Sequence, residues 1–332
     1  MMLFVVMDHC NGHGIFGPEG MDMHALWQSP FAFLSVHIGG FVAISGWFGI
    51  NFTWRKFLFL YCQVVFYSLL GCVAWNWRET NSLSLQHFRV FGGWFSGNYL
   101  ALMLMAPFLN IAVDHLGGRE AVVGKWGLLA LVVILGWCPL GVMTGIRPVQ
   151  TDEFSLFFMA FIYITARIAH HVFVKPLPLP RLVFWGASMF LWMFLSLAVK
   201  KIFPIVGGID MVFVRSRMGP YYYCLSIILL MFFVWYVRVP MWVGRICTFI
   251  SPSMFAVYLI HETTPMGRFL YLVPQKWLWE NTSLPPFCVV IVTSVATFSI
   301  CMFVDMARRG LFLIATKVMP IFGGKHKCPA KT

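Results

Sequence analysis

Long apolar runs separated by short polar connections dominate the chain. A helix that crosses a lipid bilayer needs about 20 mostly apolar residues. Runs of about this length lie near 30–50, 57–77, 94–113, 122–143, 154–173, 181–199, 218–237, 244–261 and 286–306. The pattern therefore predicts an all-α polytopic membrane protein, with one membrane-embedded domain over 1–322 and a basic tail over 323–332.

A shorter apolar run precedes His9 and is followed by glycine and polar residues. The residues from Met1 to Met7 are too few to cross a bilayer, so this first helix is incomplete, and counting it gives about ten transmembrane helices. We expect either that a longer natural protein continues the helix upstream of Met1 or that the chain carries half a helix. No cleavable signal peptide is predicted, because no basic region precedes the run.

The composition excludes a water-soluble domain. Of the residues, 60% are hydrophobic and 11% are charged, whereas ordinary soluble domains are about 25% charged. Nine cysteines are scattered without a CxxC pair, which argues against both a disulfide framework and a metal site. The net charge of +12 comes from Lys and Arg residues between the apolar runs. We therefore interpret it as membrane anchoring and expect no nucleic-acid partner.

These positive residues also predict an orientation. In a ten-span arrangement whose first helix runs outward, fifteen of the 24 Lys and Arg residues fall on the inner side. Cytoplasmic loops carry an excess of positive residues, so both ends are expected in the cytoplasm. The tail after Pro320 would lie near anionic lipid headgroups.

His9 is the first candidate for chemistry. An ionisable side chain inside a membrane segment is costly, so it is a functional candidate by default. Imidazole is also the side chain best suited to carry a proton near neutral pH. The alternative is an interfacial histidine that caps a helix end. Asp8 points about 100° away on a helix, so any partner that orients His9 must come from another helix.

Four stretches of the sequence form a pattern when taken together. They are the apolar run ending in His9, the segment Phe41–Trp47, Ala106–Asn110 and Phe255–Glu262. Together they resemble the type-3 membrane acyltransferases, a bacterial family that O-acylates surface glycans, since the last three are similar to the family's "FFVISGF", "sPfLN" and "fgvYLIH". They stand in the family's order and cover nearly the whole chain.

The resemblance implies an integral-membrane O-acyltransferase, most simply an O-acetyltransferase, of the bacterial inner membrane. His9 would be the general base, and Arg55 and Lys56 would attract the phosphates of acetyl-coenzyme A, a co-substrate rather than a permanently bound cofactor. The acceptor would be a hydroxyl of a surface glycan or exopolysaccharide, and lipids would surround the helices. One feature departs from the family, because the arginine expected eleven positions before His9 would fall upstream of Met1.

Four further residues are candidates for the substrate site, each with a simpler alternative. Ser45 could approach the acyl chain, although small residues in its segment also favour close helix packing. His37 could line the site or be a hydrogen-bonded interior histidine. His261 and Glu262 could form the acceptor pocket, or mark the point where a helix reaches water.

The basic residues could have a simpler role than binding the acyl donor. Arg55 and Lys56 could simply anchor the inner end of a span, and the same ambiguity applies to Arg167, His170, His171 and Lys175. Asp305 and Arg308 stand three residues apart, which predicts an ion pair on one face of a helix, expected at the inner interface.

A second class of function remains open, namely a secondary transporter or a carrier of a lipid-linked glycan. Such proteins are often built from two halves with matching broken helices. Pro107, Pro139 and Pro252 interrupt predicted spans but do not recur at matching positions in two halves. This pattern favours the enzyme.

Overall fold

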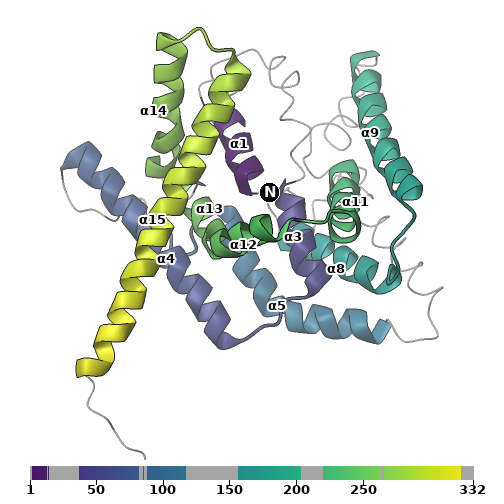
Figure 1. The fold of residues 1–332 in the computed structure, drawn as a ribbon, viewed down its shortest axis with the longest axis horizontal. Helices are drawn as coiled ribbons and strands as arrows, with labels where there is room; N and C mark the ends of the chain where they lie inside the picture. The colour runs from purple at the N-terminus through teal and green to yellow at the C-terminus, as the bar shows by residue number, and fades with distance from the viewer. Residues whose placement is uncertain are drawn as a thin grey trace, which may run out of the picture.

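The computed structural model describes residues 2–12, 14, 37–81, 85, 88–116, 156–202, 220–262 and 265–322, and every regular element in these ranges is a helix (Figure 1). The all-α prediction is therefore confirmed for this part of the chain. The helices are α1 (Met2–Gly12), α3 (His37–Phe48), α4 (Trp54–Thr80), α5 (Trp94–Leu116), α8 (Leu156–Val172), α9 (Leu179–Ile202), α11 (Pro220–Tyr236), α12 (Met241–Ile250), the 3-10 turn η2 (Ser251–Ser253), α13 (Met254–Glu262), α14 (Pro265–Asn281) and α15 (Pro286–Phe322).

Four helical segments in the described ranges are long and apolar enough to cross a membrane. They are Trp54–Thr80, Trp94–His115, Met241–Glu262 and Pro286–Phe312. Each overlaps a span predicted from the sequence. The structure is thus consistent with a multi-pass membrane protein. The predicted span 122–143 and the tail 323–332 lie outside the described residues.

Three other predicted spans are described only in part, because residues 30–36, 154–155 and 218–219 lie outside the described ranges. The described helices inside them are α3, with 12 residues, and α8 and α11, with 17 residues each. Helix α3 stops at Phe48 because Gly49 adopts a positive φ of 75°. The predicted run continues two residues further, to Ile50, because hydropathy averages over such a backbone break.

Three further differences concern the C-terminal third. The single run 244–261 is divided into α12 and α13 by the turn η2 at Pro252. Helix α14 was not predicted as an element, because its mixture of apolar and polar residues falls below a membrane-span pattern. Helix α15 continues to Phe322, well past the predicted end at 306.

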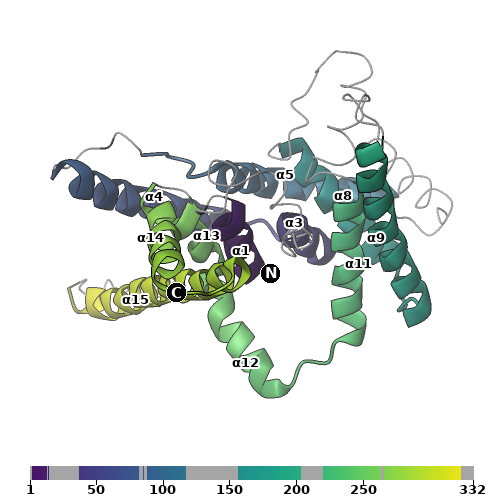
Figure 2. The same ribbon diagram turned by 90° about the horizontal axis from the view of Figure 1, so that it is seen from above.

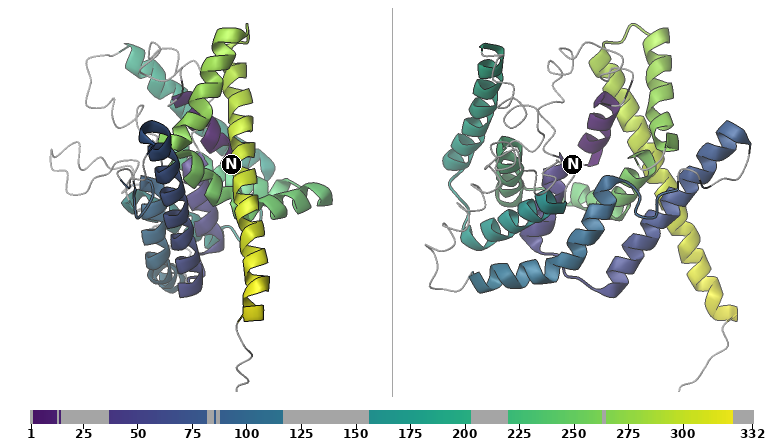
Figure 3. Two further views of the ribbon diagram at one scale, coloured as in Figure 1. Left: turned by 90° about the vertical axis from the view of Figure 1, so that its left-hand side faces the viewer. Right: turned by 180° about the vertical axis from the view of Figure 1, so that it is seen from behind.

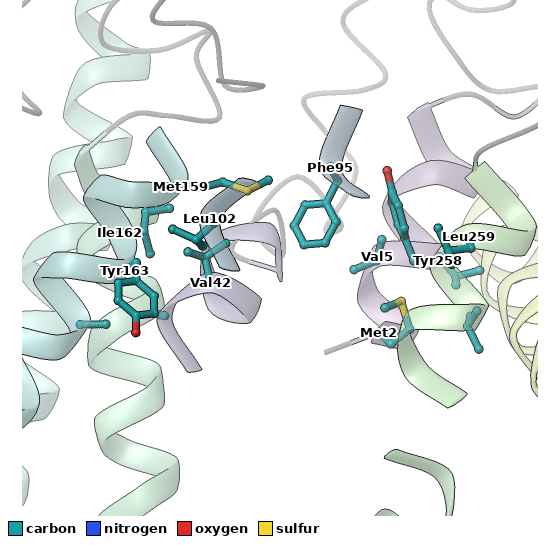
Figure 4. Packing of buried hydrophobic residues seen from close by; sticks show 14 of the residues in the cluster. Met2, Val5, Val42, Phe95, Leu102, Met159, Ile162, Tyr163, Tyr258 and Leu259 are labelled. Carbon is teal, nitrogen blue, oxygen red and sulfur yellow. The ribbon is translucent and has the colours of Figure 1, made fainter. Parts of the chain in front are cut away.

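The helices form two packed groups. Helices α1, α13, α14 and α15 lie together and are crossed by α4, whereas α3 packs chiefly against α8 and α11, with α9 beside α11 (Figures 1 and 2). Helix α12 projects sideways from the body, across the direction of α15 (Figure 3, left). In the core, Phe95 of α5 lies between side chains of the two groups (Figure 4).

Glycine allows the closest approach within the second group. A Cβ atom added to Gly46 of α3 would stand 2.3 Å from the backbone oxygen of Tyr163 on α8. Only a residue without a side chain permits this contact. The close-packing interpretation of the small residues around Ser45 is therefore confirmed at Gly46.

A buried polar contact ties α4 to α15. The Tyr67 hydroxyl donates to Asp305 Oδ1 over 2.6 Å, and Arg308 Nη2 lies 2.7 Å from the same oxygen. Arg308 Nε also donates to the Tyr67 oxygen over 3.0 Å. The predicted Asp305–Arg308 pair is confirmed, and a tyrosine from a helix far away in sequence completes it.

Candidate functional site

Helix α1 is short, and neighbouring helices hold it in place. Val6 and Cys10 are fully buried on one face of α1. Near its end, the side-chain amide of Gln275 on α14 donates to the backbone oxygen of Cys10 over 2.8 Å. That oxygen lies in the last turn of α1, where carbonyls lack intrahelical partners. Packing and this bond together fix the position of His9.

His9 lies against the end of α13. Its Nδ1 atom is 2.9 Å from Nε2 of His261 and 3.3 Å from Oε2 of Glu262. The three residues come from segments about 250 positions apart; His9 and His261 are buried, and the Glu262 side chain is 9% exposed. The structure therefore brings together the candidate base and two residues that the sequence analysis placed in a substrate pocket.

The hydrogen bonds determine which nitrogen carries each proton. His261 Nδ1 lies 2.5 Å from the backbone oxygen of Val257. A carbonyl only accepts, so Nδ1 of His261 carries a proton, and Nε2 of the neutral ring is an acceptor. Nδ1 of His9 must then donate to it. This assignment leaves the lone pair of the His9 imidazole on Nε2, the atom a general base uses to accept a proton.

Aromatic rings form one wall of this cluster. The Tyr258 ring lies 6.4 Å from the His9 ring and 6.0 Å from the His261 ring, and the Phe95 ring packs 5.1 Å from Tyr258. Tyr258, His261 and Glu262 are spaced at three and four residues on α13, so they lie along one helical face. The apolar wall limits water access, which strengthens the electrostatic interactions inside.

The remaining predicted substrate residues lie elsewhere. Ser45 hydrogen-bonds the Tyr99 hydroxyl over 2.9 Å and donates to the backbone oxygen of Phe41, so it joins α3 to α5. His37 is the first residue of α3, and its side chain lies outside the described part of the structure.

The two predicted donor-binding cations stand in the first turn of α4. Both Arg55 and Lys56 are exposed. Lys56 Nζ donates to the backbone oxygen of Asn51 over 3.1 Å, and Thr53 caps the helix by accepting from the Lys56 backbone N–H. These residues are therefore placed at the start of a 27-residue helix, and no contact between them and His9, His261 or Glu262 is part of the assignment.

Sequence reasoning missed several residues that build the site. Gln275 is fully buried within an otherwise apolar face, and that mismatch was the available signal. Tyr258 lies in the "YLIH" stretch, but only the structure shows its ring beside His9. In the described part of the chain, no group of three or more His, Cys, Asp or Glu residues is arranged to hold a metal ion.

Comparison with known proteins identifies no relative of this chain. No protein-family model matches the chain, and no curated protein or solved structure shows significant similarity to it. Functional conclusions therefore depend on the side chains themselves.

Proposed function

We propose that the protein is an integral-membrane O-acyltransferase that moves an acyl group, most simply acetyl, from acyl-coenzyme A to a glycan hydroxyl. The observation that carries the proposal is the buried contact of His9 with His261 and Glu262. It gives the candidate base a defined tautomer and a carboxylate beside the same nitrogen. The arrangement of histidine, carboxylate and apolar wall suits proton abstraction from a hydroxyl.

In this reaction His9 Nε2 removes the proton of the acceptor hydroxyl as its oxygen attacks the thioester carbonyl carbon. The carbon–sulfur bond then breaks, and the imidazolium returns the proton to the departing thiolate. The products are the O-acyl ester and free coenzyme A, so atoms and charge balance. A positioned imidazole contributes roughly 100- to 10,000-fold in rate to such a step.

Glu262 and His261 have supporting roles. While His9 carries the extra proton, the Glu262 carboxylate 3.3 Å from Nδ1 stabilises the positive ring. His261, held by the Val257 carbonyl, accepts from His9 and keeps its ring oriented. This is the logic of a nucleophile-activating histidine that is oriented by a third group.

The membrane arrangement belongs to the same proposal. Ten spans with both ends in the cytoplasm of a bacterial inner membrane would follow from the positive-residue distribution. The donor would then reach the protein from the cytoplasm, where coenzyme A resides, and the glycan from the opposite side.

The test uses the full chain in lipid nanodiscs with acetyl-coenzyme A, and it follows thiol release. Alkali-labile acetate on the surface glycans of expressing cells is measured in parallel. We expect His9→Ala to lower the turnover of both readouts about 100-fold or more, because a base acts chiefly in the transition state. Glu262→Gln should lower it less, since the imidazole remains.

His115→Ala is the matched control, because His115 is an exposed histidine at the end of α5. It should retain wild-type turnover. The proposal is wrong if His9→Ala, shown to be folded by an unchanged unfolding temperature, transfers acetyl groups at the wild-type rate.

A further inference from the structure

A cavity of about 340 Å³ opens where α3 ends, α4 begins and α5 passes Pro107. Its lining includes the backbone of the loop that joins α3 to α4, together with Asn110 of α5 and Arg167 of α8. Its volume lies in the range of small-molecule sites. The cavity is distinct from the His9 cluster and shares no lining residue with it.

Side chains from two helices hold the loop rigidly. The Ile50 backbone N–H donates to the Tyr163 hydroxyl over 2.9 Å, and that hydroxyl donates to Asn110 Oδ1 over 2.7 Å. The Asn110 amide closes the triangle by donating to the Ile50 backbone oxygen over 3.2 Å. Both polar groups of the Ile50 backbone are thus fixed, so the cavity is preorganised in the folded protein.

Arg167 supplies a positive charge to the cavity. It lies one helical turn after Tyr163, and its guanidinium rests against Gly49, where an added Cβ would stand 2.9 Å from Nη1. Asp114 lies 3.6 Å from Nη2, but within the described residues the buried Nε donor has no hydrogen-bond acceptor. Such an unsatisfied donor in a cavity wall is a candidate contact for an anionic ligand.

Three further features favour a ligand that carries phosphates and a nucleobase. The N-terminus of α4, capped by Thr53, begins beside the cavity and carries partial positive charge. Lys56 reaches back to the oxygen of Asn51, which itself lines the cavity, and Arg55 is exposed on the same turn. Phe48 and Phe52 also line the cavity and offer aromatic faces on which a nucleobase could stack.

We infer that this cavity binds the nucleotide portion of the acyl donor, with Arg167 contacting its phosphates. The inference rests on the proposed function, which requires a coenzyme A thioester. Helix α5 connects the two places, since Phe95 belongs to the His9 wall and Pro107 to the cavity. Twelve residues of helix span roughly 18 Å, so the extended pantetheine arm of the donor would lead from the cavity to His9.

The test measures equilibrium binding of coenzyme A, which cannot turn over, to the full chain in nanodiscs. Asn51 lines the cavity and is exposed, so a negative or positive charge can be introduced at this position without removing a buried contact. We expect Asn51→Asp to weaken binding about threefold and Asn51→Lys to strengthen it similarly. Arg167→Lys should weaken binding about tenfold, because lysine cannot match phosphate in a bidentate manner.

Asn281→Asp is the matched control, since it makes the same charge change at an exposed asparagine on α14. It should leave binding unchanged, and pantetheine, which lacks the nucleotide, should bind far more weakly than coenzyme A. His9→Ala should bind coenzyme A normally, which separates docking from chemistry.

The outcomes distinguish the two proposals. Coenzyme A affinity that is indifferent to both Asn51→Asp and Arg167→Lys overturns the cavity assignment, even if His9-dependent acyl transfer is observed. Affinity that follows these variants, without any acyl transfer, supports the cavity as a nucleotide site and contradicts the acyltransferase. Failure of the wild-type protein to bind coenzyme A overturns the inference.

Discussion

Two polar regions in the described part of the chain differ in how far their charged side chains are exposed to solvent. Around α1, α13 and α15, ionisable groups are buried and paired, as in the His9–Glu262 and Asp305–Arg308 contacts. At the junction of α3, α4, α5 and α8, the charges of Arg55, Lys56 and Asp114 meet solvent.

This difference separates two kinds of function. Buried charges interact strongly because little solvent screens them, so each contact contributes much to stability or chemistry. Exposed charges contribute little individually, but together they attract and orient a charged ligand. The region around His9 is therefore suited to a reaction, and the cavity region to docking.

The largest difference in the free energy of unfolding is expected between variants of two aspartates. Asp305→Asn removes the charge that balances Arg308, whose side chain is only 11% exposed. The free energy of unfolding should fall by about 3 to 5 kcal/mol. Asp114→Asn removes a partner of Arg167 from a half-exposed position, and should cost no more than about 1 kcal/mol. Denaturant unfolding in detergent measures both, and equal losses would refute the contrast.

The sequence predicted a contact within one helix better than a contact between distant helices. The Asp305–Arg308 pair follows from a three-residue spacing on one helix, and the structure contains it. The contact between His9 and Glu262 links segments about 250 positions apart, and one sequence carries no signal for such a pairing. Local geometry can be predicted from periodicity, whereas contacts between distant helices depend on the packing of the whole fold.

The ends of the helices are also difficult to predict from hydropathy alone. The apolar run 57–77 contains no backbone break, and α4 covers it fully. The run 30–50 contains Gly49, whose positive φ ends α3 at Phe48, before the predicted end of the run. Gly49, with Asn51 two positions later, was the available signal, but hydropathy does not register it. The loop that follows this glycine lines the cavity, and the sequence analysis did not predict a site there.

A second prediction tests how α1 is held. Gln275→Leu removes the donor to the buried Cys10 oxygen and should lower the free energy of unfolding by about 1 to 3 kcal/mol. Because the bond fixes the end of α1, turnover should fall while coenzyme A affinity stays constant. Asn281→Leu on the exposed face of α14 is the control. A variant that loses coenzyme A affinity and keeps its turnover would contradict this division of roles.

A smaller loss of stability is expected for Gly49→Ala in the cavity region. Gly49→Ala places a side chain at a φ of 75° and 2.9 Å from Arg167 Nη1. The strain should cost about 1 to 2 kcal/mol of stability, and the displaced guanidinium should weaken coenzyme A binding. Gly244→Ala provides the comparison, because Gly244 lies inside α12 with nothing within 4 Å of the added Cβ. There alanine should stabilise the helix by about 0.5 to 1 kcal/mol.

The smallest effect is expected at Arg55, where charge acts without a fixed contact. Arg55→Ala should raise the Michaelis constant for acetyl-coenzyme A about two- to threefold and leave the turnover number unchanged, because a solvent-exposed charge contributes less than about 1 kcal/mol to binding. The effect should shrink as the salt concentration rises, since ions screen exposed charges beyond roughly 8 Å at physiological strength. Arg181→Ala removes another exposed charge, from the first turns of α9, and should change neither constant. An effect of Arg55→Ala on turnover that persists in high salt would place Arg55 in the chemistry, and the separation between a buried reaction centre and an exposed docking site would then be wrong.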